Sequence, residues 1–492
     1  MTNTVPLRIL LSSQFRTQYP SVYSQECDCS PSENGFYLTT STILLQDPLH
    51  QATLHIQNLS KEYTLMFNPL HNSGVVVLNS AAKQVWNKFQ IPRRLESFVT
   101  EDYDVFAVAK KMLDIGLLEP VNGNIWPDKS SSQTLSAWLH VTNECNLRCD
   151  YCYIHKTDED MSLDIGYAAV DAILRSATKG GFKRIKLKFA GGEATLNLKL
   201  VFALHTYALN LTTQAGLELE SVILSNGVAI GERDIAEFKA RRIGIMISLD
   251  GLGQMHDAQR KFSNGKGSFA WVSRTLDRLV TRGLKPFISI TVSDRNSDGL
   301  PEVVDYVLDQ DLPFNINFFR DNECAAPFSD LKLRDERIIE AMRRAFAVIE
   351  AKLPTTRSLL GSLVDRAQFE RPHDKTCGVG DSYFTIDHHG NVAKCHMEIE
   401  TPITNVYADD PLALIRADKS GIRNLSVEEK EGCRECEWRY WCAGGCPLLT
   451  FRATGRYDVK SPYCHIYKAI YPEMLRLEGL RLLKLSGIDL KI

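Results

Sequence analysis

The chain has 492 residues, enough for about three domains that each bury a core. Its 57 Lys and Arg residues nearly balance 60 Asp and Glu residues, and a net charge of −3 gives no basis for general affinity for nucleic acid or anionic membranes. No apolar run reaches the length of a bilayer span, and the first residues lack the basic region and the cleavage site of a secretory signal. A cytoplasmic location is therefore predicted, where thirteen cysteines favour metal or redox work over disulfides.

Residues 1–132 are predicted to form a small α+β domain with a winged-helix-like outline. Strand-like stretches at 36–45, 52–57, 63–67 and 75–79 precede helical patterns at 80–89 and 103–115. A nucleic-acid reader of this shape would need a basic recognition helix, which the segment lacks. A plain structural cap stays open as an alternative. Residues 122–133, rich in Asn, Asp and Ser, are predicted to link this domain to the next.

Short apolar strands alternate with amphipathic helices from about residue 135 to residue 350. The strands are predicted at 135–141, 185–190, 221–224, 243–249, 286–292 and 314–319, and the helices at 164–178, 198–212, 232–241, 269–282, 300–309 and 334–351. Six β-α units in a row predict a parallel sheet, with function at the carboxyl ends of its strands. The predicted fold class is therefore α/β, with a partial (β/α)6 TIM-like barrel over residues 133–365.

Three cysteines, Cys145, Cys149 and Cys152, directly follow the first strand of this barrel. Thiols at positions i, i+4 and i+7 can wrap three corners of a [4Fe–4S] cube and leave its fourth iron without a protein ligand. The C-x3-C-x2-C pattern, with Tyr151 before the last cysteine, resembles the radical S-adenosylmethionine (radical SAM) enzymes. The resemblance implies that the open iron chelates the cofactor, whose reductive cleavage yields a 5′-deoxyadenosyl radical that abstracts hydrogen from substrate.

Later strand ends carry residues that resemble the cofactor-binding segments of the same family. They are Gly191, Gly192 and Glu193 after the second strand, Ser225 and Asn226 after the third, and Ser248 and Asp250 after the fourth. Glycines let backbone groups approach a ligand closely, and a carboxylate can pair with an ammonium group. The resemblance implies that this set binds S-adenosylmethionine (SAM). His256, in the next loop, is expected to be solvated or structural and is not a catalytic candidate.

Seven more cysteines lie in the predicted third domain, residues 366–475: Cys377, Cys395, Cys433, Cys436, Cys442, Cys446 and Cys464. Their C-x2-C element by itself suits zinc about as well as iron–sulfur. The full pattern resembles the SPASM extension of radical SAM enzymes, which implies up to two auxiliary [4Fe–4S] clusters. By that resemblance, one cluster binds Cys433, Cys436, Cys442 and Cys464, and the other binds Cys377, Cys395 and Cys446.

The second of these sets lacks the further upstream cysteine found in the family. His373 or another side chain takes the fourth corner, or the iron is open to substrate. Metal binding is expected to tie the hairpin at 387–391 to the later loop and to be coupled to folding. Cys324, Cys27 and Cys29 are expected to be spare thiols, and residues 476–492 to form a C-terminal helix.

The motifs indicate a radical SAM peptide maturase of the SPASM group that modifies a ribosomally made precursor peptide. The N-terminal domain resembles leader-binding domains of such pathways, which take the leader peptide as an added strand. The implied partners are that peptide and an electron donor such as flavodoxin or ferredoxin, with no nucleic acid and no membrane. The alternatives are an anaerobic sulfatase-maturating enzyme that makes formylglycine, and a non-catalytic iron–sulfur or zinc protein. No catalytic proton acceptor is singled out.

Overall fold

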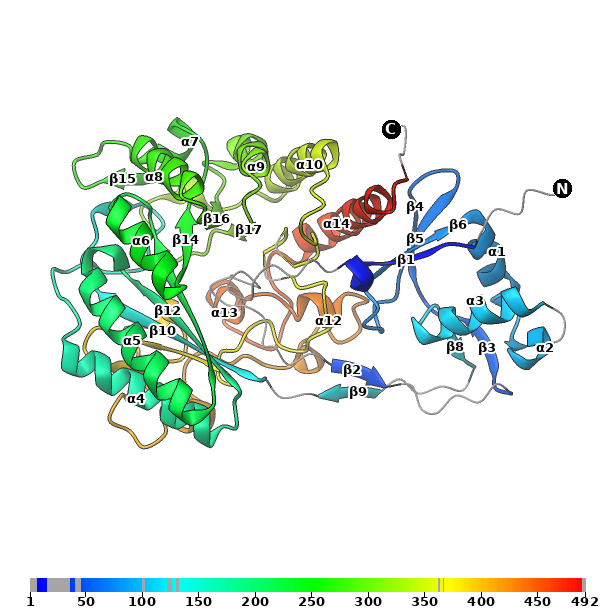
Figure 1. The fold of residues 1–492 in the computed structure, drawn as a ribbon, viewed down its shortest axis with the longest axis horizontal. Helices are drawn as coiled ribbons and strands as arrows, with labels where there is room; N and C mark the ends of the chain where they lie inside the picture. Colours follow the sequence, from blue (N-terminus) through cyan, green and yellow to red (C-terminus); the bar gives the residue numbers. More distant parts are fainter. Residues whose placement is uncertain are drawn as a thin grey trace.

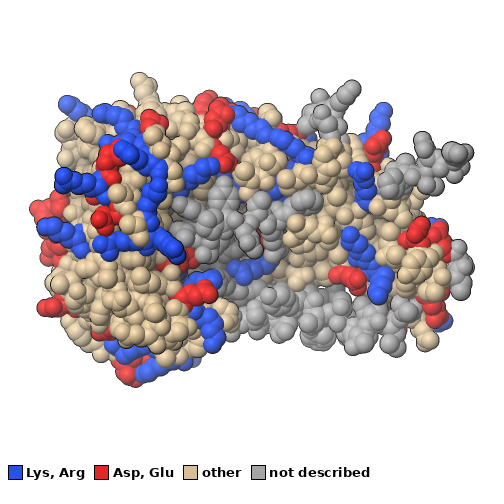
Figure 2. Space-filling model, in the orientation of Figure 1, with Lys and Arg blue, Asp and Glu red and all other residues tan. Residues whose placement is uncertain are grey.

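The computed structural model describes residues 7–15, 36–39, 46–99, 102–121, 126–129, 132–361, 363–365 and 367–488. In Figure 1 the N-terminal elements lie on the right, the parallel sheet and its helices lie on the left, and much of the cysteine-rich region lies between them. No helix among the described residues has both the length and the apolar character needed to cross a bilayer. Lys and Arg are interspersed with Asp and Glu over the face in Figure 2, in keeping with the small net charge.

The N-terminal region is built on an antiparallel sheet with the strand order β1-β6-β5-β4. Its elements are β1 (Ile9–Leu11), β4 (His55–Asn58), β5 (Tyr63–Phe67), β6 (Val75–Asn79), α1 (Ser80–Asn87), α2 (Glu96–Val99) and α3 (Tyr103–Asp114). Because side chains alternate along a strand, β5 and β6 bury both faces of the sheet. Met66 and Val76 join the core under α1 and α3, whereas Phe67 and Val77 join the main core of the molecule.

Aromatic side chains hold the second face of this sheet against the cysteine-rich region. Phe67 meets Trp441 with ring centroids 4.9 Å apart, and Phe369 stacks on Trp441 at 5.6 Å. The indole Nε1 of Trp441 donates a hydrogen bond to the carbonyl of Pro69 at 2.8 Å. Buried aromatic contacts of this kind dominate the energy of an interface, so the two regions form one continuous core.

The smaller strands of this region correct two predictions. They are β2 (Phe36–Thr39), β3 (Pro48–Gln51), β7 (Arg93–Arg94), β8 (Leu118–Pro120) and β9 (Trp126–Lys129). The predicted linker at 122–133 contains β9, which pairs with β2, because a strand can be stabilised by a partner far away in sequence that composition does not reveal. The strand predicted at 52–57 is β4, which lies at His55–Asn58.

The predicted parallel sheet is confirmed in order and in position. It runs β10 (Thr134–Thr142), β12 (Arg184–Gly191), β13 (Glu218–Ser225), β14 (Gly244–Ser248), β16 (Phe287–Val292) and β17 (Phe314–Phe318). Its helices are α4 (Leu163–Lys179), α5 (Leu198–Ala215), α6 (Glu232–Arg241), α8 (Phe269–Thr281), α9 (Leu300–Asp309) and α10 (Asp335–Lys352). β17 and β10 do not pair with each other, so the barrel is partial and its strands deliver their carboxyl ends to one mouth.

The same sheet continues into the cysteine-rich region, which composition did not indicate. β18 (Tyr383–Ile386) pairs in parallel with β10 and is followed by the antiparallel strands β19 (Asn391–Ala393) and β20 (Thr404–Asn405). The hairpin expected at 387–391 is therefore the turn between β18 and β19, and the proposed division at residue 365 falls within a region that shares one sheet.

The C-terminal helix α14 spans Cys464–Leu485, so its predicted start at residue 476 is wrong. Pro472 lies inside this helix and would ordinarily break it. Ile466, Tyr467, Ile470 and Tyr471 are all buried, and their packing outweighs the lost backbone hydrogen bond. The early start matters because it places Cys464 at the first turn of a rigid helix.

Candidate active site

A cavity of about 170 Å³ opens at the carboxyl ends of the parallel strands. Cys145, Cys149 and Cys152 all line it. Seven of the eight predicted cofactor-binding residues line the same cavity: Tyr151, Gly191, Gly192, Glu193, Ser225, Asn226 and Ser248. The structure thus brings together residues that are spread over about a hundred positions, because each follows a strand of one parallel sheet.

The cysteine loop is held by a small antiparallel ribbon. β11 (Leu147–Cys149) pairs with β15 (Arg260–Phe262), which places Cys149 opposite Arg260. The backbone N–H of Leu147 donates to Cys145 Sγ at 3.4 Å, and that of Cys152 donates to the Cys149 carbonyl at 3.1 Å. Pairing with the loop after β14 therefore fixes the cysteine loop from outside its own sequence.

The two glycines at the end of β12 allow close backbone packing, in addition to the cofactor contact predicted for them. A Cβ on Gly191 would lie 2.1 Å from the carbonyl oxygen of Thr142, and one on Gly192 would lie 2.1 Å from that of Glu144. The N–H of Gly192 donates to Thr142 at 2.9 Å and that of Glu193 donates to Glu144 at 2.8 Å. The glycines thus let the start of the cysteine loop pack directly on the end of β12.

Glu193 joins the ends of β12 and β13. Its carboxylate accepts hydrogen bonds from Ser225 Oγ and from the backbone N–H of Asn226, both at 2.7 Å, and from Thr195 Oγ1 at 2.5 Å. The side-chain amide of Asn226 donates in turn to Asn146 in the cysteine loop at 2.7 Å. These bonds to a buried carboxylate set the cavity wall in one arrangement.

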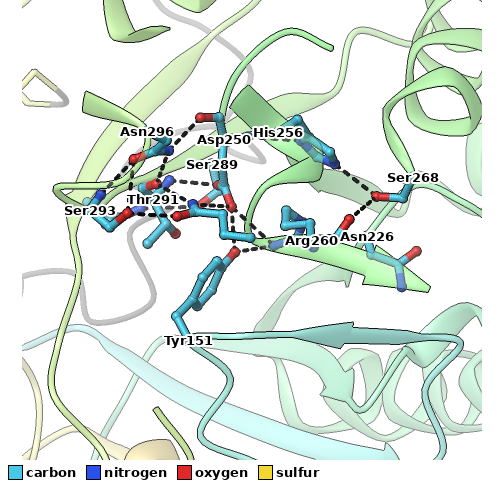
Figure 3. A network of polar contacts seen from close by, with 12 residues as sticks. Tyr151, Asn226, Asp250, His256, Arg260, Ser268, Ser289, Thr291, Ser293 and Asn296 are labelled. Carbon is cyan, nitrogen blue, oxygen red and sulfur yellow. Dashed lines mark hydrogen bonds and ion pairs between the residues drawn. The ribbon is translucent and has the colours of Figure 1, made fainter. Parts of the chain in front are cut away.

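Asp250 does not line the cavity. Figure 3 shows it within a network of polar contacts that includes Tyr151 and Arg260. Its carboxylate accepts from Tyr151 Oη at 2.7 Å, from Gln259 Nε2 at 3.1 Å and from the backbone N–H of Thr291 at 2.9 Å. Arg260 also hydrogen-bonds to Tyr151 and lies 3.6 Å from Asp250. Asp250 is only 1% exposed, so it orients Tyr151 and Arg260. A direct contact with the cofactor, as predicted, would require this network to open.

His256 is structural, as expected. Its Nδ1 accepts a hydrogen bond from the backbone N–H of Asp250 at 3.3 Å, and its Nε2 lies 3.1 Å from Ser268 Oγ. Burial lowers the pKa of His256 well below its ordinary value, so the ring is neutral and holds the loop after β14 in place.

Two cations at the cavity were missed by the sequence analysis. Arg260 is the first residue of β15, well beyond the end of β14, and it reaches the cavity only because β15 pairs with the cysteine loop. Lys156 lines the cavity beside Cys152. Burial opposes its charge, but the electrostatic interaction and the hydrogen bond with Cys152 raise the pKa of Lys156 above its usual value. A basic residue four positions after the last cysteine was the available signal for Lys156.

The later cysteines gather in two groups. Cys433, Cys436, Cys442 and Cys464 line one small cavity together with Tyr467, Lys468 and Tyr471. Cys377, Cys395 and Cys446 pack together in another buried cluster with Trp138 and Tyr383. The two groups coincide with the two predicted ligand sets. Binding of iron by either group stays a prediction.

A family model for the radical SAM superfamily matches residues 139–307, which include the cysteine loop and the strand ends of the cavity. This protein is a radical SAM enzyme. It is 24% identical over 346 residues to an uncharacterized protein of Archaeoglobus fulgidus, covering 68% of this chain and 79% of the relative. It is 21% identical over 362 residues to a cysteine-type anaerobic sulfatase-maturating enzyme of Clostridium perfringens, covering 67% of this chain and 93% of that enzyme.

A solved structure with a similar fold is that of anSMEcpe with bound AdoMet and the Cp18Cys peptide. It shares 19% identity with this chain at a TM-score of 0.59, and the likeness covers 72% of this chain and 99% of the other. This likeness shows a shared fold. The cofactors of the radical SAM enzyme described here are a [4Fe–4S] cluster and SAM.

The buried thiols at the cavity must lose their protons before they can bind an iron–sulfur cluster. Burial raises the pKa of Cys145 to about 12 and that of Cys149 to about 11, and neighbouring thiols add to both effects. Without iron these groups are neutral thiols at pH 7. Cluster assembly in this radical SAM enzyme must therefore release their protons, so it is favoured at higher pH.

The fourth corner beside Cys377 has no thiol among the described residues. Asn424 lies beside it, with Nδ2 at 3.7 Å from Cys377 Sγ and a buried Oδ1 that has no hydrogen-bond partner in the described part of the chain. His373 places its Nδ1 3.4 Å from the carbonyl of Arg371, and burial lowers its pKa to about 4. Cys324 lies 3.4 Å from His155 Nε2, and Cys27 and Cys29 fall outside the described residues.

Proposed function

We propose that this radical SAM enzyme is a peptide maturase that modifies a ribosomally made precursor peptide. The observation that carries the proposal is the N-terminal region, whose sheet packs against the cysteine-rich region. The likeness to anSMEcpe covers almost all of that chain but leaves more than a quarter of this one unmatched. A chain that only matured a sulfatase would have no evident use for such an addition.

The N-terminal sheet suits a peptide partner. β4 is an edge strand, and Ile56 on it is 42% exposed. Two polar atoms of the same strand, His55 Nε2 and Gln57 Oε1, are buried and lack a hydrogen-bond partner within the described residues. A leader peptide added beside β4 would gain main-chain hydrogen bonds, while its side chains could contact Ile56.

The roles in the cavity follow from its lining. Cys145, Cys149 and Cys152 bind the first cluster, which supplies one electron for the cleavage of SAM, and flavodoxin or ferredoxin is the proposed electron donor. The SAM-binding residues are Tyr151, Gly191, Gly192, Glu193, Ser225, Asn226 and Ser248, with Asp250 as a positioning residue. The two later groups of cysteines hold the auxiliary clusters.

The proposal is tested by anaerobic co-expression with any short peptide that is encoded beside the gene, followed by mass spectrometry of that peptide. We expect a changed mass with the wild-type enzyme and an unchanged mass with the Cys149→Ala variant. An unchanged peptide in the presence of an enzyme that still cleaves SAM would overturn the assignment. Conversion of a Cys or Ser in a sulfatase peptide to formylglycine would favour sulfatase maturation, which the likeness to the Clostridium enzyme supports as the second candidate.

Leader binding is tested separately with a matched pair of surface variants. Ile56→Asp places a charge on the edge strand, whereas Ile91→Asp places one at a more exposed position, 73% exposed, away from that edge. We expect the peptide to bind about tenfold or more weakly to Ile56→Asp and normally to Ile91→Asp. Equal binding of the peptide by both variants would rule out β4 as the strand beside which the leader peptide binds.

A further inference from the structure

Lys430 is a buried lysine that lies between the two groups of later cysteines. It is 1% exposed, and its Nζ donates a hydrogen bond to the carbonyl of Ala443 at 2.7 Å. Ala443 directly follows Cys442 of one group and precedes Cys446 of the other by three residues. The ammonium group is therefore held at the short segment that connects the two sites.

The segment is shaped to accept this side chain. A Cβ on Gly444 would lie 2.7 Å from Lys430 Cδ and 3.0 Å from its Nζ, so the glycine leaves room for the lysine. Thr376, next to Cys377, donates its Oγ1 to the same Ala443 carbonyl at 2.9 Å. The backbone N–H of Cys433 donates to the Lys430 carbonyl at 3.1 Å. Lys430 thus contacts the segments that carry both groups.

The charge of Lys430 has no carboxylate counter-ion within ion-pair distance among the described residues. A buried ammonium without a partner is costly, which is why buried charges in proteins are paired or lie beside metal centres. Burial lowers the pKa of Lys430, and the electrostatic interactions that oppose this effect come from Cys433 and Cys442 of one group and from Cys377 and Cys446 of the other. Two members of each group therefore face one cation.

We propose that Lys430 is a positioning residue that acts as the shared counter-ion of the two auxiliary clusters and raises the reduction potential of both. This inference rests on the proposed ligand sets. A [4Fe–4S] cluster with cysteine thiolates carries net negative charge, and its potential depends on charge and hydrogen bonding around it. One fixed positive charge between two such sites favours the reduced state of each and makes electron transfer into this region more favourable.

The test is a potentiometric titration followed by electron paramagnetic resonance. A background in which Cys145, Cys149 and Cys152 are all replaced by Ala removes the first cluster, so only the auxiliary signals remain. Lys430→Met keeps the length of the side chain and removes its charge, and Ala443 keeps its bond from Thr376. We expect both auxiliary clusters to titrate at lower potential, with the ratio of reduced to oxidised cluster at a fixed potential falling about tenfold or more.

Lys468→Met is the matched control. Lys468 is exposed and its charge faces Cys436 and Cys464, which belong to one group only. We expect this variant to leave the cluster of Cys377, Cys395 and Cys446 unchanged. A shift of both clusters by Lys468→Met equal to that of Lys430→Met would mean that any nearby charge suffices, which contradicts a specific role for Lys430.

The remaining outcomes separate this inference from the proposed function. Full iron content with unchanged potentials, or a shift of one cluster alone, overturns the role of Lys430 and leaves the ligand sets intact. Absence of auxiliary iron from the parent protein overturns both. If Lys430→Met does not assemble clusters, Lys430→Arg decides: assembly restored by arginine supports the role of charge, and failure of both variants refutes it. None of these measurements uses the peptide, so the result does not depend on whether the proposed substrate is correct.

Discussion

Gly192 offers the sharpest test of how the cavity is built. The φ angle of Gly192 lies outside the left-handed region, so an alanine here would be strained only by contacts of its methyl group. That methyl would lie 2.1 Å from the carbonyl oxygen of Glu144, 2.5 Å from its carbon and 2.6 Å from the carbonyl oxygen of Asn143. All three are backbone atoms, so no side chain can rotate away. The cysteine loop must therefore move by about 1 Å or more to restore ordinary contact.

We expect Gly192→Ala to cost about 1–3 kcal/mol in stability, the usual range for overpacking, and to displace Cys145 from the other two thiols. A displacement of about 1 Å in an active site can reduce the rate by about 100-fold. The assay is reductive cleavage of SAM by the anaerobically reconstituted protein, together with iron content and thermal unfolding. Gly231→Ala is the control, because its methyl would meet only a flexible carboxylate at 3.4 Å. Normal cleavage by Gly192→Ala would refute the close packing of the loop on β12.

Three further predictions concern single side chains. Cys149→Ala should abolish SAM cleavage while the auxiliary iron stays in place. Cys324→Ala, which removes the thiol beside His155, is the control and should retain cleavage. Cleavage of SAM by Cys149→Ala would refute the ligand assignment. Asp250→Asn replaces one acceptor oxygen by an NH2 group, which then faces the donors that this oxygen served among Tyr151, Gln259 and Thr291, and it should lower the free energy of unfolding by about 2–4 kcal/mol. Ser248→Ala should weaken SAM binding without a loss of stability, as judged by SAM titration and thermal unfolding. Burial lowers the pKa of His140 to about 3, so the unfolded chain binds a proton near pH 6.5 that the folded chain does not. The free energy of unfolding should therefore fall by about 1 kcal/mol between pH 6.5 and 5.5. His140→Phe should abolish this part of the pH dependence.

The parallel sheet and its helices follow closely from sequence because their signal is local. Alternating apolar strands and amphipathic helices have their own periodicities, and all six strands and six helices lie where these patterns indicate, with ends that differ by three residues or fewer. The two groups of later cysteines were also predictable, since the family resemblance carried the grouping that the structure reproduces in space.

Partners distant in sequence account for what was missed. β9 was predicted as linker because its strand partner β2 lies about ninety residues earlier. The start of α14 was predicted too late; Pro472 disfavours a helix in sequence terms, whereas buried side chains stabilise it in the fold. Arg260 reaches the cavity through a ribbon between two loops, which no pattern in either loop reveals. Asp250 was assigned to the cofactor by family resemblance, but it does not line the cavity, and its carboxylate accepts three hydrogen bonds from Tyr151, Gln259 and Thr291.

The amino-acid sequence by itself determined which chemistry the chain can carry, because cysteine spacing and strand-end residues are local properties that survive without a fold. Only the tertiary structure decided how closely these parts meet. The glycines after β12 proved to serve backbone packing, and Lys430 proved to lie buried between two groups of thiols. Both facts depend on atoms from separate segments that share one small volume, and close packing of the folded chain is what sets those distances.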